Sequence, residues 1–240
     1  HHHAHLASCM AENGLEGNVI GVIFDGTGYG ADGTIWGGEF LVGGYDGYRR
    51  AAHFRATALP GGDAAVREPW RMAMSYLYQA YGEAAFSTDH PVARQLSGQE
   101  QRVFAGMLRR GINSPMTSSC GRLFDAVAAM LNIRHKVSYD GQAAIELEAF
   151  AETVEGNELG SYTYKIMHHA EDPDQLDFSP IFPEILADIG AGVQAAAIAA
   201  RFVSSIASAT TDVCLHISDS TGLDRVILSG GVFQNRLFSE

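Results

Sequence analysis

VIGVIFDGTGYG, residues 19–30, is the stretch of sequence that decides the fold. Residues 19–24 are apolar, rich in β-branched side chains and followed by turn-forming residues, which predicts a buried β-strand. We expect residues 26–30 to form a loop and residues 34–42 to supply the returning strand of a hairpin. Because a second strand follows the glycines, where a Rossmann site would have a helix, this is not a dinucleotide-binding fingerprint.

The other end of the chain has the opposite layout, in which a strand and two glycines lead into a helix. Residues 224–228 predict that strand, and Ser229, Gly230 and Gly231 form the turn before a terminal helix. The hydrophobic spacing between the two ends predicts helices over residues 64–81, 121–131, 142–155 and 192–210, with a break or a bend near Thr211. Strand–glycine units at both ends with helices between them indicate an α/β architecture.

The composition restricts the class of protein. The chain has 240 residues, 46% of them hydrophobic, which suits one large domain or two lobes that share a cleft. Residues 168–180 are the best candidate boundary, because they are polar, acidic and contain proline. A net charge of −12 argues against binding to nucleic acid.

The cellular location is predicted from three kinds of sequence pattern: membrane spans, signal peptides and cysteine motifs. No apolar run approaches the roughly 20 residues of a membrane span, and we find no signal peptide pattern. Three widely spaced cysteines without a CxxC motif suit reduced thiols in an intracellular protein. We therefore expect a cytoplasmic protein without membrane contact.

Asp25 and the residues after it form the first candidate site. Glycines let backbone N–H groups approach an anion closely, so Gly26, Thr27 and Gly28 are candidates to cradle a phosphate. Asp25 could position a metal, a water or a ribose. A tight hairpin turn explains the same residues about as well, and the sequence leaves both interpretations open.

Gly230, Gly231 and Asn235 form the second candidate site. The glycines allow close approach at a helix N-terminus, where the helix dipole favours anions or polar edges. Asn235, one turn into the helix, could hydrogen-bond a nucleoside. An ordinary strand-to-helix turn is an equally good explanation of this stretch alone. Two such glycine units at opposite ends of one chain favour a shared nucleotide cleft.

Two acidic side chains on helices are further candidates. Asp125 lies on a helix that otherwise faces the core, and the residues alone favour a solvent-exposed position for it. Gly141 forms a turn into the next helix, and Glu146 follows about one turn later. An acidic residue near a helix N-terminus is expected for the helix dipole alone, so this pattern does not require a function.

HHHAHLASCM, residues 1–10, contains a possible metal-binding pair. His1 and His5 are four residues apart, which on a helix places both imidazoles on one face, as zinc and iron sites require. Such a pair needs at least one further ligand, typically a carboxylate, and Cys9 is a weaker candidate. The residues alone are explained equally well by a purification tag.

Six stretches in order resemble one family, the HypF carbamoyltransferases of hydrogenase maturation, in their C-terminal catalytic region. The stretches are HHHAHLASCMAE, FDGTGYGADGTIWGGEFLVG, LPGGDAAVREPWRMA, TSSCGRLFDAVAAML, YDGQAAIELE and ILSGGVFQN. The resemblance covers essentially the whole chain and implies that the histidines are native. It implies a fold of the actin-like ATPase (RNase H-like) superfamily, with mixed sheets flanked by helices around a nucleotide cleft.

The resemblance also implies roles for individual residues. His1 and His5 match an HxxxH pair that binds iron or zinc near the phosphate of a nucleotide. The stretch from Asp25 to Gly28 matches a loop that contacts the phosphate or the acyl group. The nucleoside side of the site is matched by Asp125, which would bind the ribose, by Gly141 and Glu146, and by Gly230, Gly231 and Asn235 of the GGxxxN turn.

The implied reaction has two stages. An upstream YrdC-like domain of family members makes carbamoyl adenylate from carbamoyl phosphate and ATP. The region resembled here transfers the carbamoyl group to the C-terminal cysteine of the partner protein HypE. We therefore expect residues 1–240 to be a partial catalytic domain, with the YrdC-like domain upstream and a third metal ligand, an aspartate, beyond Glu240. We consider a homodimer as well as a monomer.

Other functions remain open on the sequence. Within the same superfamily, the chain could be a small-molecule O-carbamoyltransferase or a tRNA threonylcarbamoyl transferase, although the negative net charge argues against a tRNA substrate. A non-catalytic fragment that binds a nucleotide or docks the partner is an alternative of a different class. The HxxxH pair argues against a sugar kinase of related fold.

Overall fold

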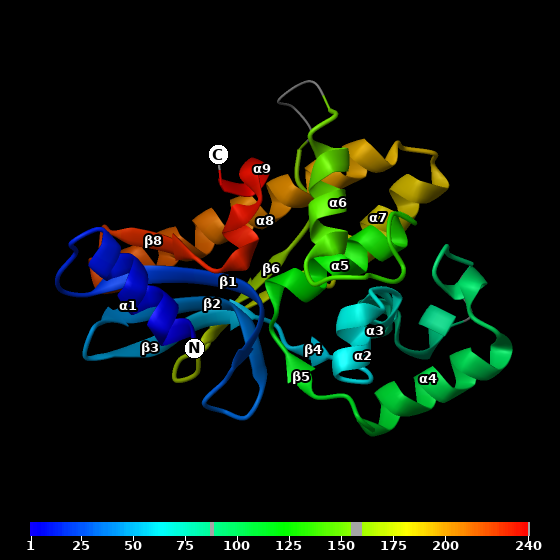
Figure 1. The fold of residues 1–240 in the computed structure, drawn as a ribbon, viewed down its shortest axis with the longest axis horizontal. Helices are drawn as coiled ribbons and strands as arrows, with labels where there is room; N and C mark the ends of the chain where they lie inside the picture. The colour runs from blue at the N-terminus through cyan, green and yellow to red at the C-terminus, as the bar shows by residue number, and fades with distance from the viewer. Residues whose placement is uncertain (87–88, 155–159, 240) are drawn as a thin grey trace.

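The computed structural model of the chain describes residues 1–86, 89–154 and 160–239, and the eight strands within them form one mixed sheet (Figure 1). The strands are β1 (Val19–Tyr29), β2 (Ile35–Gly44), β3 (Gly47–Phe54), β4 (Thr57–Ala58), β5 (Met116–Thr117), β6 (Lys165–Met167), β7 (Asp174–Asp177) and β8 (Val226–Ser229). β1 lies between β2, to which it is antiparallel, and β8, to which it is parallel. On the other side of β2 the order continues through β3 and β7 to β6, and the short β4 and β5 attach to one end of β2.

Helices cover both faces of this sheet (Figure 1). The α-helices are α1 (His2–Glu12), α2 (Asp63–Arg67), α3 (Trp70–Tyr81), α4 (Gly98–Arg110), α5 (Cys120–Met130), α6 (Gln142–Ala151), α7 (Ile181–Gly190), α8 (Ala195–Thr221) and α9 (Arg236–Ser239). Short 3-10 helices cover Gly82–Phe86, Ala93–Gln95 and Gly231–Gln234. The α/β architecture expected from the sequence is confirmed.

β1 is apolar throughout its first half because it is buried on both faces. Ile20, Val22 and Phe24 belong to the main core, which β1 shares with α5, α8 and the neighbouring strands. Val19 and Ile23 point to the opposite face and pack in a smaller core beneath α1. Alternate side chains of one strand therefore hold two helical layers together, as the period of two in a strand requires.

The expected loop at residues 26–30 is not a separate loop. β1 continues to Tyr29 and pairs with β2 again at Gly28, opposite Trp36. The register shifts between Phe24 and Gly28, so Asp25, Gly26 and Thr27 form an irregularity within the strand. Irregularities of this kind bend a strand and redirect its side chains, which is how Asp25 leaves the sheet.

The expected helix over residues 64–81 is in fact two helices. α2 ends at Arg67 and α3 begins at Trp70, on either side of Pro69. Glu68 adopts φ −128° and ψ 78°, because the residue before a proline is disfavoured in the helical region. The helix expected over 142–155 ends at Ala151, and residues 155–159 lie outside the described part of the chain.

Of the break or bend expected near Thr211, the break is wrong, because α8 runs without interruption for 27 residues. Val213 and Ile217 continue its buried stripe past that point. Thr210 and Thr211 donate their hydroxyls to the carbonyls of Ile206 and Ala207, so both side chains are satisfied within the helix.

α8 also corrects the expectation that no segment resembles a membrane span. By length and composition the helix could cross a membrane, since its most apolar window has a mean hydropathy of 1.2. Half of that window is buried inside the protein, however, where α8 packs against α6 and α7. The apolar stripe is therefore explained by core packing.

The segment 168–180, expected to be a boundary, contains β7 and leads into α7. β7 pairs in parallel with β3, and its residue Leu176 is buried. The two-lobe division of the chain stays a prediction.

Gly230 provides a test of how β8 is joined to β1. Its φ of 101° and ψ of 161° are accessible essentially to glycine alone, and an added Cβ would lie 2.2 Å from the carbonyl oxygen of Phe24. We expect Gly230→Ala to lower the free energy of unfolding by at least about 3 kcal/mol. Gly222→Ala is the matched control, because Gly222 has φ 73° and open space around it, and it should cost only about 1 kcal/mol. Equal losses in urea titrations would contradict this account.

Candidate functional site

Three potential metal ligands meet where α1 passes the end of β1. The Nε2 atom of His1 lies 3.0 Å from Oδ2 of Asp25, and the Nε2 atom of His5 lies 3.4 Å from the same oxygen. One ligand atom from each side chain falls within 4.8 Å of the others. The HxxxH spacing thus places both imidazoles on one face of α1, as expected, and β1 supplies the carboxylate.

Neighbouring groups orient these side chains. Nδ1 of His5 is 3.2 Å from the Ser229 hydroxyl, which leaves Nε2 facing Asp25. The backbone N–H of Gly26 donates to Oδ1 of Asp25 over 2.8 Å, which leaves Oδ2 facing the imidazoles. Outer contacts of this kind fix ligand geometry in metal sites.

His2 and Gly28 shape the apolar side of the cluster. An added Cβ on Gly28 would lie 2.3 Å from Cε1 of His2 and 2.6 Å from Cδ2 of His1, so this glycine makes room for the two rings. His2 is buried, and neither of its ring nitrogens has a hydrogen-bond partner in the structure. Burial lowers the pKa of His2, which favours a neutral ring there.

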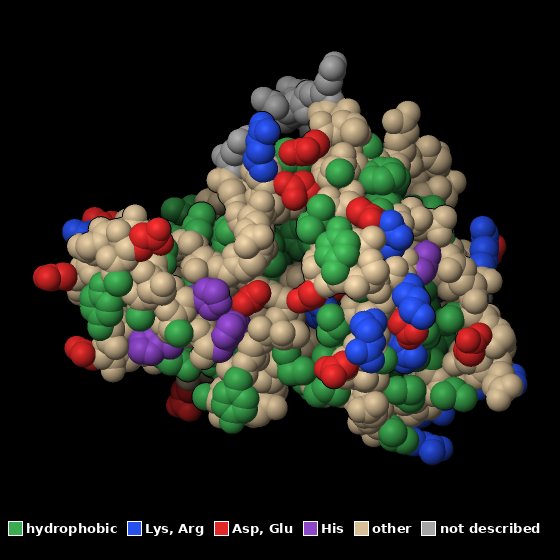
Figure 2. Space-filling view, in the orientation of Figure 1, with side chains coloured by type: hydrophobic (Ala, Val, Ile, Leu, Met, Phe, Trp, Pro, Cys, Tyr) green, Lys and Arg blue, Asp and Glu red, His purple; other side chains and the backbone are tan. Residues whose placement is uncertain are grey.

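A cavity of about 530 Å³ opens beside the cluster, within the usual size range of small-molecule sites. Figure 2 shows histidine side chains gathered over α1 with acidic side chains beside them. Asp25 belongs to both the cluster and the cavity. The cavity is lined by Asp25, Gly26, Gly121, Arg122, Phe124, Asp125, Asp140, Gly141, Ala144, Ile145, Glu148, Gly231, Val232, Gln234 and Asn235.

Asp125 is buried in the wall of this cavity, which corrects the solvent-exposed position favoured by the residues alone. Burial raises its pKa to about 6; nearby Arg122 opposes that rise and Asp140 adds to it. Nε of Arg122 lies 3.1 Å from Oδ2 of Asp125, close enough for an ion pair but not aligned as a hydrogen bond. Nη1 of Arg122 is buried without a hydrogen-bond partner in the structure. Such unsatisfied buried groups are typical of a site that receives a ligand.

The structure brings most of the predicted residues together but separates others. Asp25, Gly26, Asp125, Gly141, Gly231 and Asn235 line the cavity, and Gly230 lies directly behind it against β1. Thr27 is exposed and Gly28 faces the histidines, so neither contributes to the lining.

Glu146 also lies outside the cavity lining. It forms an ion pair with Arg134, and its hydrogen bonds with that side chain lower its pKa. Glu148, two residues later on α6, lines the cavity instead. Sequence reasoning missed Arg122, Asp140 and Glu148, although all three lie inside the quoted stretches TSSCGRLFDAVAAML and YDGQAAIELE.

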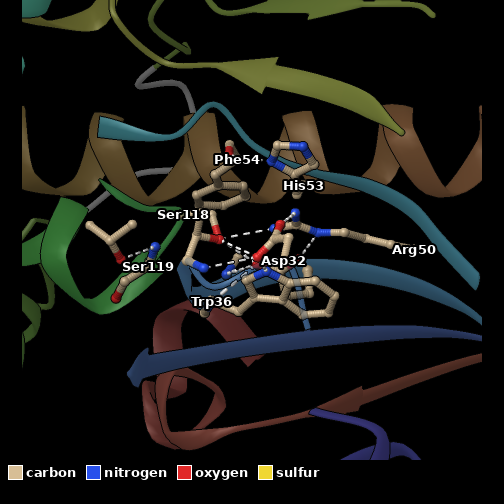
Figure 3. A network of polar contacts seen from close by, with 12 residues as sticks. Asp32, Trp36, Arg50, His53, Phe54, Ser118 and Ser119 are labelled. Carbon is tan, nitrogen blue, oxygen red and sulfur yellow. Dashed lines mark hydrogen bonds and ion pairs between the residues drawn. The ribbon is translucent and has the colours of Figure 1, made fainter. Parts of the chain in front are cut away.

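A fully buried carboxylate, Glu39 on β2, bonds to residues of β2, of β3 and of the segment before α5, next to this site. Its oxygens accept hydrogen bonds from the backbone N–H groups of Gly37 and Gly38, from Nε of Arg50 over 2.6 Å, and from the Ser118 hydroxyl. Figure 3 shows Arg50 extending toward Ser118 and Asp32, with Trp36 beside them. The guanidinium lies 4.0 Å from the centre of a Trp36 ring, a cation–π contact.

Ser119 connects this network to the cavity. Its hydroxyl accepts a hydrogen bond from the N–H of Arg122, as the N-cap of α5. The same hydroxyl lies 3.0 Å from the carbonyl of Asp25 and 2.6 Å from that of Gly26, to which it donates. The start of α5 is thereby joined to the irregular end of β1.

The chain is similar to known proteins over its whole length. Residues 21–240 match the family model described as "Carbamoyltransferase, Kae1-like Domain, second subdomain". A carbamoyltransferase HypF homolog of Cupriavidus necator is 38% identical, over 100% of this chain and 60% of that protein. Carbamoyltransferase HypF of Rhodobacter capsulatus is 39% identical, over 98% of this chain and 30% of that protein.

Two solved structures agree with the fold. The crystal structure of full-length HypF in the phosphate- and nucleotide-bound form has a TM-score of 0.91 and 37% identity, over 100% of this chain and 36% of that one. The crystal structure of T. kodakarensis HypF has a TM-score of 0.84 and 33% identity, over 31% of that chain. The chain thus spans only part of these relatives, and the expected actin-like ATPase architecture is confirmed.

The Glu39–Arg50 pair gives a test of how the site is held. Arg50→Met would leave Glu39 buried without its cation, and we expect a loss of about 3–5 kcal/mol in the free energy of unfolding. Arg49→Met is the control, because Arg49 is exposed on the same strand, and it should change stability by less than about 0.5 kcal/mol. Similar urea midpoints for the two variants would show that the buried pair does not stabilise the fold.

Proposed function

The chain belongs to the HypF carbamoyltransferase family, and from this membership we propose that residues 1–240 bind carbamoyl adenylate and transfer its carbamoyl group to a thiolate. The proposed acceptor is the C-terminal cysteine of a HypE-like partner, in the maturation of [NiFe] hydrogenase. The observation that carries the proposal is the cavity of about 530 Å³ that ends at the His1–His5–Asp25 cluster.

The polar groups of the cavity support one orientation of the nucleotide. In the proposal, Asp125 accepts hydrogen bonds from the ribose hydroxyls, and Asn235 and Glu148 lie on the nucleoside side. The phosphate and the carbamoyl group then lie toward Asp25 and Gly26, because the Asp25 side chain belongs both to the cavity lining and to the histidine cluster. Arg122, whose buried Nη1 has no hydrogen-bond partner among the described residues, would neutralise an anionic or carbonyl oxygen.

The residues of the cluster suit a divalent metal. Two imidazole nitrogens and one carboxylate oxygen are a donor set that zinc and iron accept, and the 3.0 and 3.4 Å separations need little change for coordination. Such a metal supplies a Lewis acid that stabilises charge on the departing phosphate. His1, His5 and Asp25 would hold it, and the expected aspartate beyond Glu240 stays a prediction.

Two of the chain's three thiols, those of Cys120 and Cys214, favour an acceptor that comes from a partner. Burial raises the pKa of Cys120 well above its usual value and that of Cys214 to about 11, so both stay protonated near neutral pH. A protonated thiol is a poor nucleophile. The described cysteines are all unpaired, which agrees with the proposed cytoplasmic location.

The first test combines metal content with transfer. His1→Ala/His5→Ala should lose the one equivalent of zinc or iron held by this cluster and lower the rate of carbamoyl transfer from synthetic carbamoyl adenylate to a HypE-like protein by at least about 100-fold. His3→Ala is the control, because its ring bonds the Gly44 carbonyl outside the cluster. Mass spectrometry of the acceptor's C-terminal peptide reports the product. Transfer to a small-molecule hydroxyl alone would overturn the proposed acceptor.

The second test uses the pKa of Asp125. Ionised Asp125 accepts hydrogen bonds from a ribose, and its pKa is raised to about 6. The affinity for a ribose is therefore at its full value well above pH 6 and falls as the carboxylate is protonated below that pH. Affinity for adenosine, which carries no phosphate to titrate, should fall about tenfold between pH 7.5 and pH 5. Asp125→Asn should bind more weakly and without this pH dependence.

Glu148→Gln and Glu146→Gln are a matched pair for calorimetric titration with adenosine, the measurement that also gives the pH dependence expected for Asp125. Weaker adenosine binding is expected only for Glu148→Gln, because only Glu148 lines the cavity. A larger effect of Glu146→Gln would contradict the orientation proposed for the nucleotide.

A further inference from the structure

A second cluster of two histidines and an aspartate lies away from the cavity. His168 follows β6, Asp174 begins β7 and His216 lies on α8, so three separate segments meet there. Nδ1 of His168 is 2.8 Å from Oδ2 of Asp174, and Nε2 of His216 is 3.4 Å from the same oxygen. The three ligand atoms lie within 4.8 Å of one another.

The carboxylate of this cluster is oriented toward the two rings. Oδ1 of Asp174 accepts a hydrogen bond from the backbone N–H of His169 over 3.0 Å, so Oδ2 is left to face both imidazoles. Asp25 has the same arrangement, with Gly26 as the backbone donor. A carboxylate held by one oxygen needs little reordering to coordinate a cation with the other.

The geometry also leaves access for a cation and for water. The side chains of His168 and His216 are 54% and 48% exposed, whereas Asp174 is 13% exposed. The two rings are 4.2 Å apart, and each directs a nitrogen at the shared oxygen. Two imidazole nitrogens and one carboxylate oxygen, with solvent for the remaining position, match the donor set of zinc.

We propose that His168, Asp174 and His216 form a second binding site for a divalent transition metal, zinc or a cation of similar preference. The bound cation would take the place of the hydrogen between His168 and Asp174 and would recruit His216 as well. It would join the β6–β7 turn, at the end of the sheet order, to α8. None of the three residues lines the cavity of about 530 Å³, so the site is separate from the one proposed for carbamoyl transfer.

The test is a zinc titration of the chain in the His1→Ala/His5→Ala background, which removes the first cluster. We expect about one zinc per chain with micromolar affinity or better, and cobalt should give the absorption of a coordinated ion. Adding His216→Ala should weaken zinc binding by at least about 100-fold, because even outer-shell losses cost roughly 10- to 100-fold.

His169→Ala is the matched control for this titration. The alanine keeps the backbone N–H that orients Asp174 and removes only the neighbouring imidazole, which is outside the cluster. Circular dichroism of each variant verifies folding. In the otherwise wild-type chain, His216→Ala should lose one of the two zinc equivalents, and His169→Ala should keep both. Absent or millimolar binding, or an equal loss in His169→Ala and His216→Ala, would overturn the proposal.

Discussion

Burial of β1 on both faces is the constraint on which the rest of the structure depends. Its apolar side chains must satisfy two cores, one beneath α1 and one against α5 and α8, so polar groups are excluded from the strand until Asp25. The register shift after Phe24 then turns that carboxylate out of the sheet. Gly230 packs against the Phe24 carbonyl and Ser119 donates to the next two carbonyls, so three distant segments converge on one strand end.

The buried charges near that strand end fall into two groups that differ in how well they are satisfied. Glu39 has four donors, including a guanidinium, and such a complete network rigidifies the scaffold. Asp125 and Arg122 are only partly compensated, and burial raises the pKa of Asp125 to about 6. Incomplete satisfaction of buried charges is costly in a folded protein, and here it occurs in the wall of the cavity, where we propose that a ligand binds.

Two aspartates in this chain share one hydrogen-bonding arrangement, in which one carboxylate oxygen faces a pair of histidines. In each, a backbone N–H binds one carboxylate oxygen and the other faces two imidazoles, yet the settings differ. Asp25 lies beside a cavity and the buried ring of His2, whereas Asp174 lies among exposed rings. The first setting favours chemistry on a bound substrate, and the second favours a link between surface elements.

Local patterns in the sequence determined the apolar strand, the helix around residues 121–131 and the HxxxH pair on one helical face. They also determined four of the residues that line the cavity, Asp25, Gly26, Gly231 and Asn235. These depend on side-chain period, capping and glycine conformation, which neighbours along the chain decide. The break at Pro69 also has a local cause, the restriction that the proline places on Glu68, whereas the continuity of α8 past Thr211 was decided by the packing of its buried stripe.

Only the tertiary structure decided that Asp125 is buried, that Asp25 completes the histidine pair, and that Glu148 and not Glu146 reaches the cavity. Each of these facts depends on how closely segments that are far apart in the sequence approach one another. No periodicity encodes such a distance, because it arises only when the sheet and its covering helices pack together.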